Sequence, residues 1–120
     1  MVINMSKSIT FEKSKEFAIR IVRLSDYLKH TKKEYIMSAQ LLRCGTSIGA
    51  NIAEAECAVS RKDFSAKMYI AFKECNETKY WLDILYATNY LTDKQFRSIN
   101  RDCNELYKLL ASITKSANED

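Results

Sequence analysis

The feature that most constrains this chain is its lack of residues that interrupt helices. Proline is absent and glycine occurs only twice in 120 residues. Because Pro and Gly are the usual markers of turns and hairpins, few turns are expected and regular structure must run in long pieces. This pattern favours helices, and a chain of this length with 47% hydrophobic residues can bury one core within one domain.

Three short motifs predict where helices begin. Each pairs a hydroxyl residue with an acidic or amide residue three positions later, an arrangement that satisfies free N–H groups in the first helical turn. The pairs are Thr31 with Glu34, Ser60 with Asp63, and Thr92 with Gln95. With a first helix beginning near Thr10, they predict a single domain, 1–120, with helices over about residues 10–30, 32–59, 61–90 and 93–116.

Apolar or small residues recur at spacings of three and four within each predicted helix, which is the pattern of one buried face. The four stripes are Phe17, Ile21, Leu24 and Leu28; Met37, Leu41, Cys44, Ile48, Ile52, Ala55 and Val59; Phe64, Met68, Ala71, Cys75, Thr78, Leu82 and Leu85; and Phe96, Ile99, Cys103, Leu106, Leu110 and Ile113. Short connections make consecutive helices antiparallel neighbours. We therefore predict an all-α fold, an antiparallel up-down-up-down four-helix bundle.

Two further features leave apolar surface that one core does not explain. The third predicted helix carries a second row, turned about 100° or more from the core row, that consists of Ile70, Glu74, Glu77, Trp81 and Ile84. The second carries no charge over residues 44–53 and has a strip of small residues, Gly45, Gly49, Ala53 and Cys57. A helix without a polar face is covered on more than one side. We expect a second copy of the chain to cover this apolar surface. The alternative is that long side chains nearby in the same chain cover it.

The cysteine pattern and the start of the chain predict a cytoplasmic protein without metal, cofactor or small-molecule substrate. Spacings of 13, 18 and 28 residues between Cys44, Cys57, Cys75 and Cys103 provide no C-x-x-C pair for zinc. The first residues lack the basic and apolar stretches of a signal peptide, and no uncharged run is long enough to cross a bilayer. We expect the cysteines to be reduced and to pack as small apolar residues.

Positive charge is concentrated in the first half of the chain, where residues 1–62 contain 11 Lys or Arg against 6 Asp or Glu. Such residues can bind the phosphates of RNA or DNA with little sequence preference. The candidates are Arg20, Arg23, Lys29, Lys32 and Lys33. The other basic connection, near residue 61, lies at the opposite end of an up-down bundle, so one monomer does not form a single compact basic patch. An oligomer would repeat each basic cluster around a ring. Solvated charges at helix ends are an equally good explanation for any one of them.

Two alternatives to nucleic-acid binding have some support in the sequence. A protein-interaction scaffold could use aromatic anchors, although aromatic residues also serve as core; the candidates are Tyr69, Phe72, Tyr80, Trp81 and Tyr86. Arg23 and His30 have the R-x(4–6)-H spacing of HEPN-like ribonucleases, which is common by chance. One histidine cannot supply a di-iron bundle, and nucleotide-binding and hydrolase motifs are absent. We therefore predict a protein that is not an enzyme.

The segment Arg43-Cys44-Gly45-Thr46-Ser47-Ile48-Gly49-Ala50-Asn51-Ile52-Ala53-Glu54 supports a more specific comparison. With Ser60, Phe64, Ile70, Ala71 and Glu77, it resembles the four helix bundle protein family associated with 23S ribosomal RNA intervening sequences. That family has the approximate signature S-I-x-x-N-I-A-E-G, and the resemblance covers about residues 8–115. This chain departs at Ala55, where the family usually has Gly, and at Gly49, where Pro is common. The local bend of the second helix is expected to differ accordingly.

The resemblance implies oligomerisation and a nucleic-acid partner. Some family members are encoded within intervening sequences of ribosomal RNA genes, and related accessory proteins of diversity-generating retroelements form pentameric barrels that bind nucleic acid and a reverse transcriptase. It therefore implies a homo-oligomer, with a pentamer favoured, and RNA or DNA as partner. It also implies a structural role for Ser47, Asn51, Glu54 and Glu77. A polar network between the second and third helices is the simpler account of them, and a ligand site is the alternative.

Overall fold

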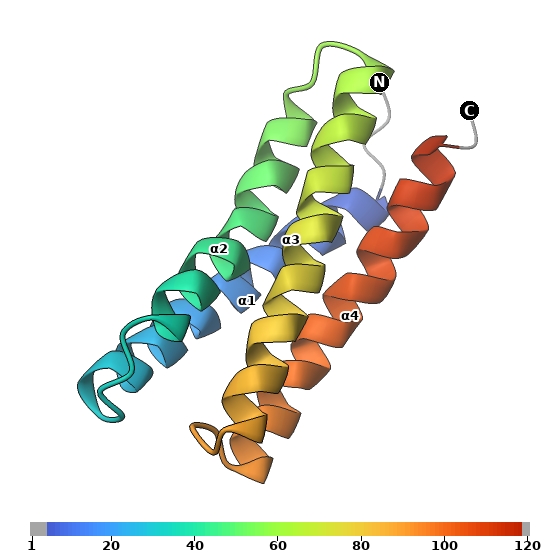
Figure 1. The fold of residues 1–120 in the computed structure, drawn as a ribbon. Helices are drawn as coiled ribbons and strands as arrows, with labels where there is room; N and C mark the ends of the chain where they lie inside the picture. The colour runs from blue at the N-terminus through green and yellow to red at the C-terminus, as the bar shows by residue number, and fades with distance from the viewer. Residues whose placement is uncertain (1–4, 119–120) are drawn as a thin grey trace.

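Four helices account for most of the computed structural model, which describes residues 5–118 and the side chains of residues 9–117. They are α1 (Met5–His30), α2 (Met37–Glu56), α3 (Arg61–Ala87) and α4 (Asp93–Asn118). Their connections alternate between the two ends of a body of 47 × 20 × 18 Å, so successive helices run in opposite directions (Figure 1). The predicted all-α four-helix bundle is confirmed.

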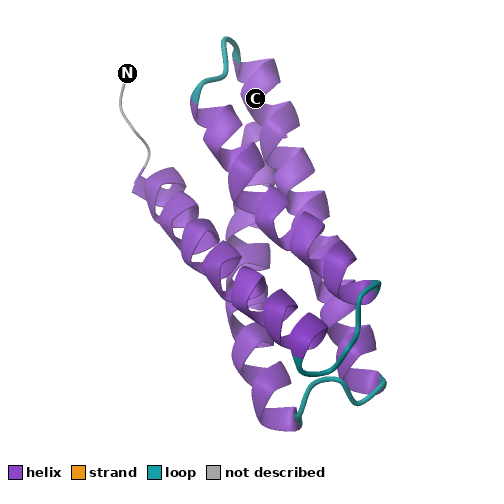
Figure 2. Cartoon of the chain, turned by 90° about the vertical axis from the view of Figure 1, so that its left-hand side faces the viewer, coloured by secondary structure: helices purple, strands orange, loops and turns teal. Residues whose placement is uncertain are grey.

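The packing around the bundle is uneven. The helices pack as α1 with α2, α2 with α3 and α3 with α4, and the contact between α1 and α4 that closes the ring is the least extensive. Figure 2 shows why, because α1 crosses the other helices at an angle and diverges from them toward its N-terminus. Among the described residues, no helix combines the length and the apolar character that a membrane span requires.

The first helix begins at Met5, earlier than the predicted start near Thr10. Of the three starts predicted from capping motifs, two are confirmed by their hydrogen bonds. The backbone N–H of Asp63 donates to Ser60 Oγ at 3.0 Å, so Ser60 caps α3. At α4, the N–H of Gln95 donates to Thr92 Oγ1 at 3.1 Å, and the N–H of Thr92 donates to Gln95 Oε1 at 2.9 Å. This reciprocal pair is the arrangement that the motif predicts.

The third predicted start is wrong, because α2 begins at Met37 and not near residue 32. The N–H of Thr31 still donates to the carbonyl of Tyr27 at 2.9 Å, so Thr31 closes the last turn of α1. Lys33 then adopts a positive φ of 57°, which turns the chain. The carboxylate of Glu34 takes over the capping role and accepts hydrogen bonds from the N–H groups of Ile36, Met37 and Ser38 at 3.2, 3.1 and 2.8 Å.

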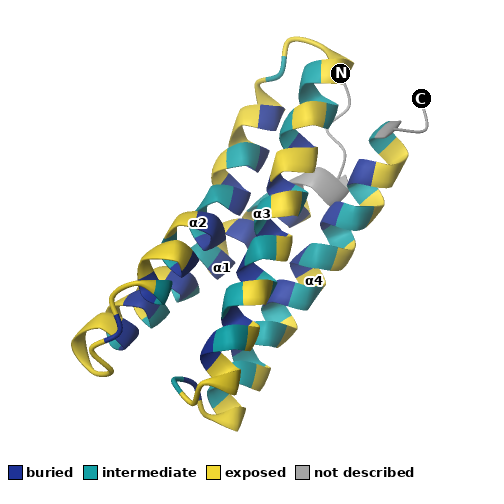
Figure 3. Cartoon of the chain, in the orientation of Figure 1, coloured by how far each residue is buried: buried dark blue, intermediate teal, exposed yellow. Residues whose placement is uncertain are grey.

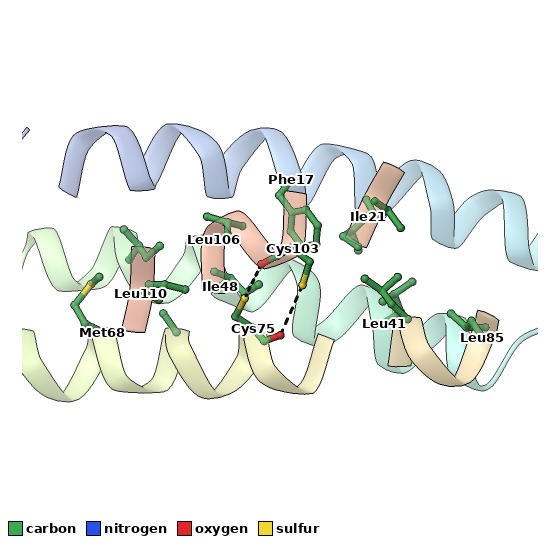
Figure 4. Packing of buried hydrophobic residues seen from close by; sticks show 14 of the residues in the cluster. Phe17, Ile21, Leu41, Ile48, Met68, Cys75, Leu85, Cys103, Leu106 and Leu110 are labelled. Atoms are coloured by element: carbon green, nitrogen blue, oxygen red, sulfur yellow. Dashed lines mark hydrogen bonds between the residues drawn. The ribbon is translucent and has the colours of Figure 1, made fainter. Parts of the chain in front are cut away.

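The predicted core stripes are largely confirmed, and the buried residues face the bundle axis (Figures 3 and 4). The buried members are Phe17, Ile21 and Leu28 from α1; Leu41, Cys44, Ile48, Ile52 and Ala55 from α2; Met68, Ala71, Cys75, Thr78, Leu82 and Leu85 from α3; and Ile99, Cys103, Leu106 and Leu110 from α4. The stripe residues that are only partly buried and pack against this core are Leu24, Met37, Phe64, Phe96 and Ile113. Val59 is the one predicted stripe residue that is exposed. It is 94% exposed because α2 ends at Glu56, three residues earlier than the stripe requires.

Three of the four free cysteines pack in the core as expected, and Cys57 does not, because it lies exposed after the end of α2. Cys75 and Cys103 meet across α3 and α4, where each sulfur contacts the other residue's carbonyl oxygen at 3.6 and 3.9 Å (Figure 4). The contact with Cys75 and burial raise the pKa of Cys103. Burial also raises the pKa of Cys44 to about 11. The thiols of Cys44 and Cys103 therefore stay protonated at neutral pH.

Both glycines of the chain lie where α1 crosses α2. A Cβ atom at Gly45 would lie 2.8 Å from Cγ2 of Ile21, and one at Gly49 would lie 3.1 Å from Oγ of Ser14. The cover that we expected from a second copy is therefore supplied at both glycines by α1 of the same chain. Ala53 and Cys57, the other members of the small-residue strip, are exposed.

We expect Gly45→Ala to destabilise the protein by about 1 kcal/mol, because overpacking against the rigid, β-branched Ile21 outweighs the gain in helix propensity of up to about 1 kcal/mol. In an Ile21→Ala background the clashing Cγ atoms are gone, so the same substitution should be stabilising. Urea unfolding of the four proteins in this cycle measures both effects. Stabilisation of the wild-type protein by Gly45→Ala would contradict the close approach.

Candidate functional site

A polar cluster joins the middle of α2 to α3. Arg43 of α2 donates through Nη1 to Glu74 Oε2 at 3.1 Å and through Nη2 to Glu77 Oε2. Trp81 Nε1 donates to the same Glu77 oxygen at 3.0 Å. We call these four residues the Arg43 cluster. Three members of the second row on α3 are thus linked to α2 within one chain.

The charges of the Arg43 cluster stabilise one another. The hydrogen bond from Arg43, followed by that from Trp81, lowers the pKa of Glu77 below its usual range. The same bond to Glu77 raises the pKa of Arg43. Glu77 is therefore an ionised partner of Arg43 at neutral pH, which is unsuited to a general base that must take up a proton. This arrangement favours the simpler interpretation, a polar network between the two helices.

The remaining residues of the α2 motif also have partners inside the chain. Ser47 Oγ donates to the Arg43 carbonyl at 2.6 Å, and Asn51 Nδ2 donates to the Ser47 carbonyl at 2.8 Å. Glu54 accepts from Lys67 Nζ of α3 at 2.9 Å. Of the second row, Ile70 remains 41% exposed and Ile84 is half-buried. The motif therefore supports α2 and its contact with α3.

Arg20 does not join the predicted basic surface. Its Nη1 lies 2.5 Å from Asp102 Oδ2, and its Nη2 donates to Ser98 Oγ at 2.9 Å. Both partners belong to α4, so Arg20 links α1 to α4 and its charge is compensated. Lys13 forms a second link of this kind, with Glu105 at 2.7 Å.

The other four predicted cations lie on the last two turns of α1 and on its connection to α2. Arg23, Lys29, Lys32 and Lys33 are all exposed, and within the described part of the chain none of them has an ion-pair partner. We call these four residues the basic end. The Glu34 carboxylate beside them is occupied by the first N–H groups of α2.

Asp26 is the exposed carboxylate of this segment, and the four cations outnumber it. His30, at the end of α1, is exposed, and its Nδ1 lies 2.9 Å from the carbonyl oxygen of Asp26 in the last helical turn. Arg23 is exposed on the same helix. The basic end is thus an exposed cationic surface, which suits phosphate binding.

An aromatic groove runs along the outside of α3 beside α4. Its lining residues are Tyr69, Phe72, Lys73, Asn76, Glu77, Tyr80 and Tyr107. The rings of Phe72 and Tyr107, which both belong to this lining, lie 5.0 Å apart between their centroids. Among the predicted aromatic anchors, Phe72 and Trp81 also pack against the core, whereas Tyr86 stacks on Phe96 at 4.2 Å.

Of the residues that line this groove, Tyr69 and Tyr80 were predicted as candidate interaction residues, whereas Lys73, Asn76 and Tyr107 were not. A signal for two of these was present, because Tyr69, Lys73, Asn76 and Tyr80 recur at spacings of four, three and four. This is the helical repeat of one face, and here the face points away from the core. Tyr107 comes from another helix, so only the packing of α3 on α4 brings it to the groove.

We expect the Arg43 cluster to give a pH-dependent fluorescence signal from Trp81, the one tryptophan of the chain. Because the pKa of Glu77 is lowered in the folded state, the stabilisation from its pairing is present above the unfolded glutamate value of about 4.3 and is lost as the pH falls through the folded pKa. The pH at the midpoint of the change in Trp81 emission should therefore lie below about 4.3, and Arg43→Met should raise this pH. Arg97→Met, which removes an arginine paired elsewhere, is the control. An unchanged midpoint in Arg43→Met would contradict the pairing.

Comparison with known proteins places the chain in a family. The model of the 23S rRNA-intervening sequence protein family matches residues 6–112. A solved structure from Bacteroides thetaiotaomicron, described as a protein of unknown function from the S23 ribosomal protein family, is 55% identical, with a TM-score of 0.90. The alignment covers 92% of this chain and 99% of that one. A search among curated proteins finds no match. With a family match over most of its length and a relative of this similarity, the chain belongs to the 23S rRNA-intervening sequence protein family.

Proposed function

We propose that this chain is a cytoplasmic, non-enzymatic binding module that forms a homo-oligomer and binds RNA or DNA through the basic end. The observation that carries the proposal is the exposure of Arg23, Lys29, Lys32 and Lys33 at one end of the bundle without ion-pair partners among the described residues. Arg20 and Arg43, in contrast, are paired with carboxylates of neighbouring helices. The basic end keeps its charge available for a partner.

Binding there would depend on phosphates. A cation without an intramolecular partner can replace the counterions that condense on nucleic acid, and their release drives association. Contacts of this kind carry no sequence information. Two of the four cations lie on the connection between α1 and α2 and two lie on α1, so they can follow a backbone of varied shape.

Self-association would multiply this weak interaction, because linked sites bind the same polymer at a high effective concentration. Support for an oligomer comes from apolar side chains on the outer faces of the helices. Ile19 and Val22 of α1 are 45% and 43% exposed, and Ile70 of α3 is 41% exposed. A closed ring of copies covers such surface on every subunit. A pentamer is the state that we favour, as the family resemblance implies.

Charge reversal at Lys29, Lys32 and Lys33 tests the basic end. In Lys29→Glu/Lys32→Glu/Lys33→Glu, we expect affinity for mixed RNA and DNA at low salt to fall more than tenfold. The slope of log K against log salt should shrink by about one for each lost phosphate contact. Fluorescence anisotropy at several salt concentrations measures both quantities.

The matched control is Arg101→Glu/Lys108→Glu/Lys115→Glu, which makes the same change in net charge at three exposed positions of α4. It should lose much less affinity than the first variant. Equal losses in the two variants would show that binding follows net charge, and unchanged affinity in the first would contradict the assigned site.

Light scattering tests the oligomer. We expect a solution mass several times that of the 13.9 kDa chain, with five subunits favoured. Ile70→Glu should lower this mass, because a charge at a self-association surface must be desolvated. Val59→Glu, which places the same charge at a 94% exposed position between α2 and α3, should leave it unchanged. A wild-type mass of one chain would contradict the proposal.

A further inference from the structure

The outward face of α3 carries a stripe of four residues, Tyr69, Lys73, Asn76 and Tyr80, which we call the tyrosine stripe. Tyr69 is 49% exposed and Tyr80 is 56% exposed. All four line the groove beside α4. Two exposed tyrosines on one helix face offer ring surface that a partner can contact.

The two tyrosines are arranged as separate platforms on one line. They are eleven residues apart, which places them about 16 Å apart along the helix and within about 20° of the same direction. That length corresponds to about five nucleotides at the roughly 3.4 Å rise of a stacked strand. Every nucleobase presents a flat face, and stacking on exposed aromatic rings is how proteins hold unpaired bases.

Two lysines beside the tyrosine stripe supply positive charge without neutralising partners. Lys73 Nζ lies 5.8 Å from the centroid of Tyr69, and Lys79 Nζ lies 4.3 Å from that of Tyr107. Neither ammonium forms an ion pair within the described residues. These cation–π contacts hold charge next to the rings, where the phosphates of a stacked strand would lie.

The nearby carboxylates leave this charge available. Glu77 lines the groove, but its charge is compensated by Arg43. Asp83 is exposed three residues after Tyr80, so its negative charge lies beyond the last tyrosine of the stripe. A polyanion on the stripe would therefore meet lysines along its length. Tyrosines also anchor protein partners, but the unpaired lysines between them favour a negatively charged ligand.

We infer that the tyrosine stripe binds single-stranded nucleic acid, with bases stacked on Tyr69 and Tyr80 and phosphates beside Lys73 and Lys79. A duplex would not fit this chemistry, because its bases are already stacked inside the helix. The inference rests on the proposed function and deepens it, since it names the ligand class and adds a site that requires bases. The basic end, in contrast, requires phosphates only.

Trp81 reports directly on this site, because its ring lies 5.1 Å from that of Tyr80 and it is the one tryptophan of the full chain. The probes are short oligothymidylate, oligouridylate and an abasic phosphodiester of equal length. We expect the two base-containing strands to quench Trp81 emission and to bind at least tenfold more tightly than the abasic one. The ratio of the affinities for oligothymidylate and oligouridylate shows whether DNA or RNA is the preferred ligand.

In Tyr69→Ala/Tyr80→Ala, affinity for the base-containing strands should fall at least tenfold, whereas affinity for the abasic strand should not change. Tyr69→Phe/Tyr80→Phe keeps both rings and should retain binding, which also controls for folding. Equal binding of abasic and base-containing strands by the wild-type protein would overturn the inference and leave the basic end standing.

Absence of binding to all three probes would overturn both the inference and the proposed function. If the alanine variant lost a protein contact, seen as a lower solution mass, while its affinity for the oligonucleotides stayed that of the wild type, the stripe would be a protein interface. That result would also overturn the inference.

Discussion

The close approach of α1 to α2 at the two glycines is the contact on which the rest of the structure depends. With no Cβ at Gly45, the fully buried Ile21 can lie directly on the α2 backbone, and Gly49 does the same for Ser14. Two helices that pack this closely can cross at an angle, as α1 does in Figure 2. The crossing leaves α1 with limited contact to α4, which the Arg20 and Lys13 ion pairs supplement.

The distribution of charge follows from the same packing. Where helices meet, cations face carboxylates, as Arg43 does across α2 and α3 and Arg20 does across α1 and α4. Other cations have no ion-pair partner among the described residues, including the four of the basic end and the lysines beside the exposed rings of the tyrosine stripe. Such surfaces have little value for the stability of one chain, since exposed charges contribute little to it. Both suit a polyanionic partner, which is the basis of the function proposed above.

Much of the fold could be predicted from the sequence because its signals are local. The capping pairs at Ser60 and Thr92 act within four residues, and the core stripes need only helical periodicity. The failures have a common cause, which is contact between distant segments or competition between two local choices. Thr31 resembles an N-cap but closes α1, while Glu34 caps α2. The partners of Gly45 and Arg20 lie on other helices, so spacing along the chain could not identify them.

Nucleic acid is proposed to bind at the α1–α2 end of the bundle. Lysine-labelling footprinting, read by mass spectrometry with and without a saturating oligonucleotide, locates the bound surface without altering the protein. We expect strong protection of Lys29, Lys32 and Lys33, which are exposed and have no ion-pair partner among the described residues, and unchanged labelling of Lys108 and Lys115 on α4. Protection of the α4 lysines with continued labelling of the basic end would contradict it.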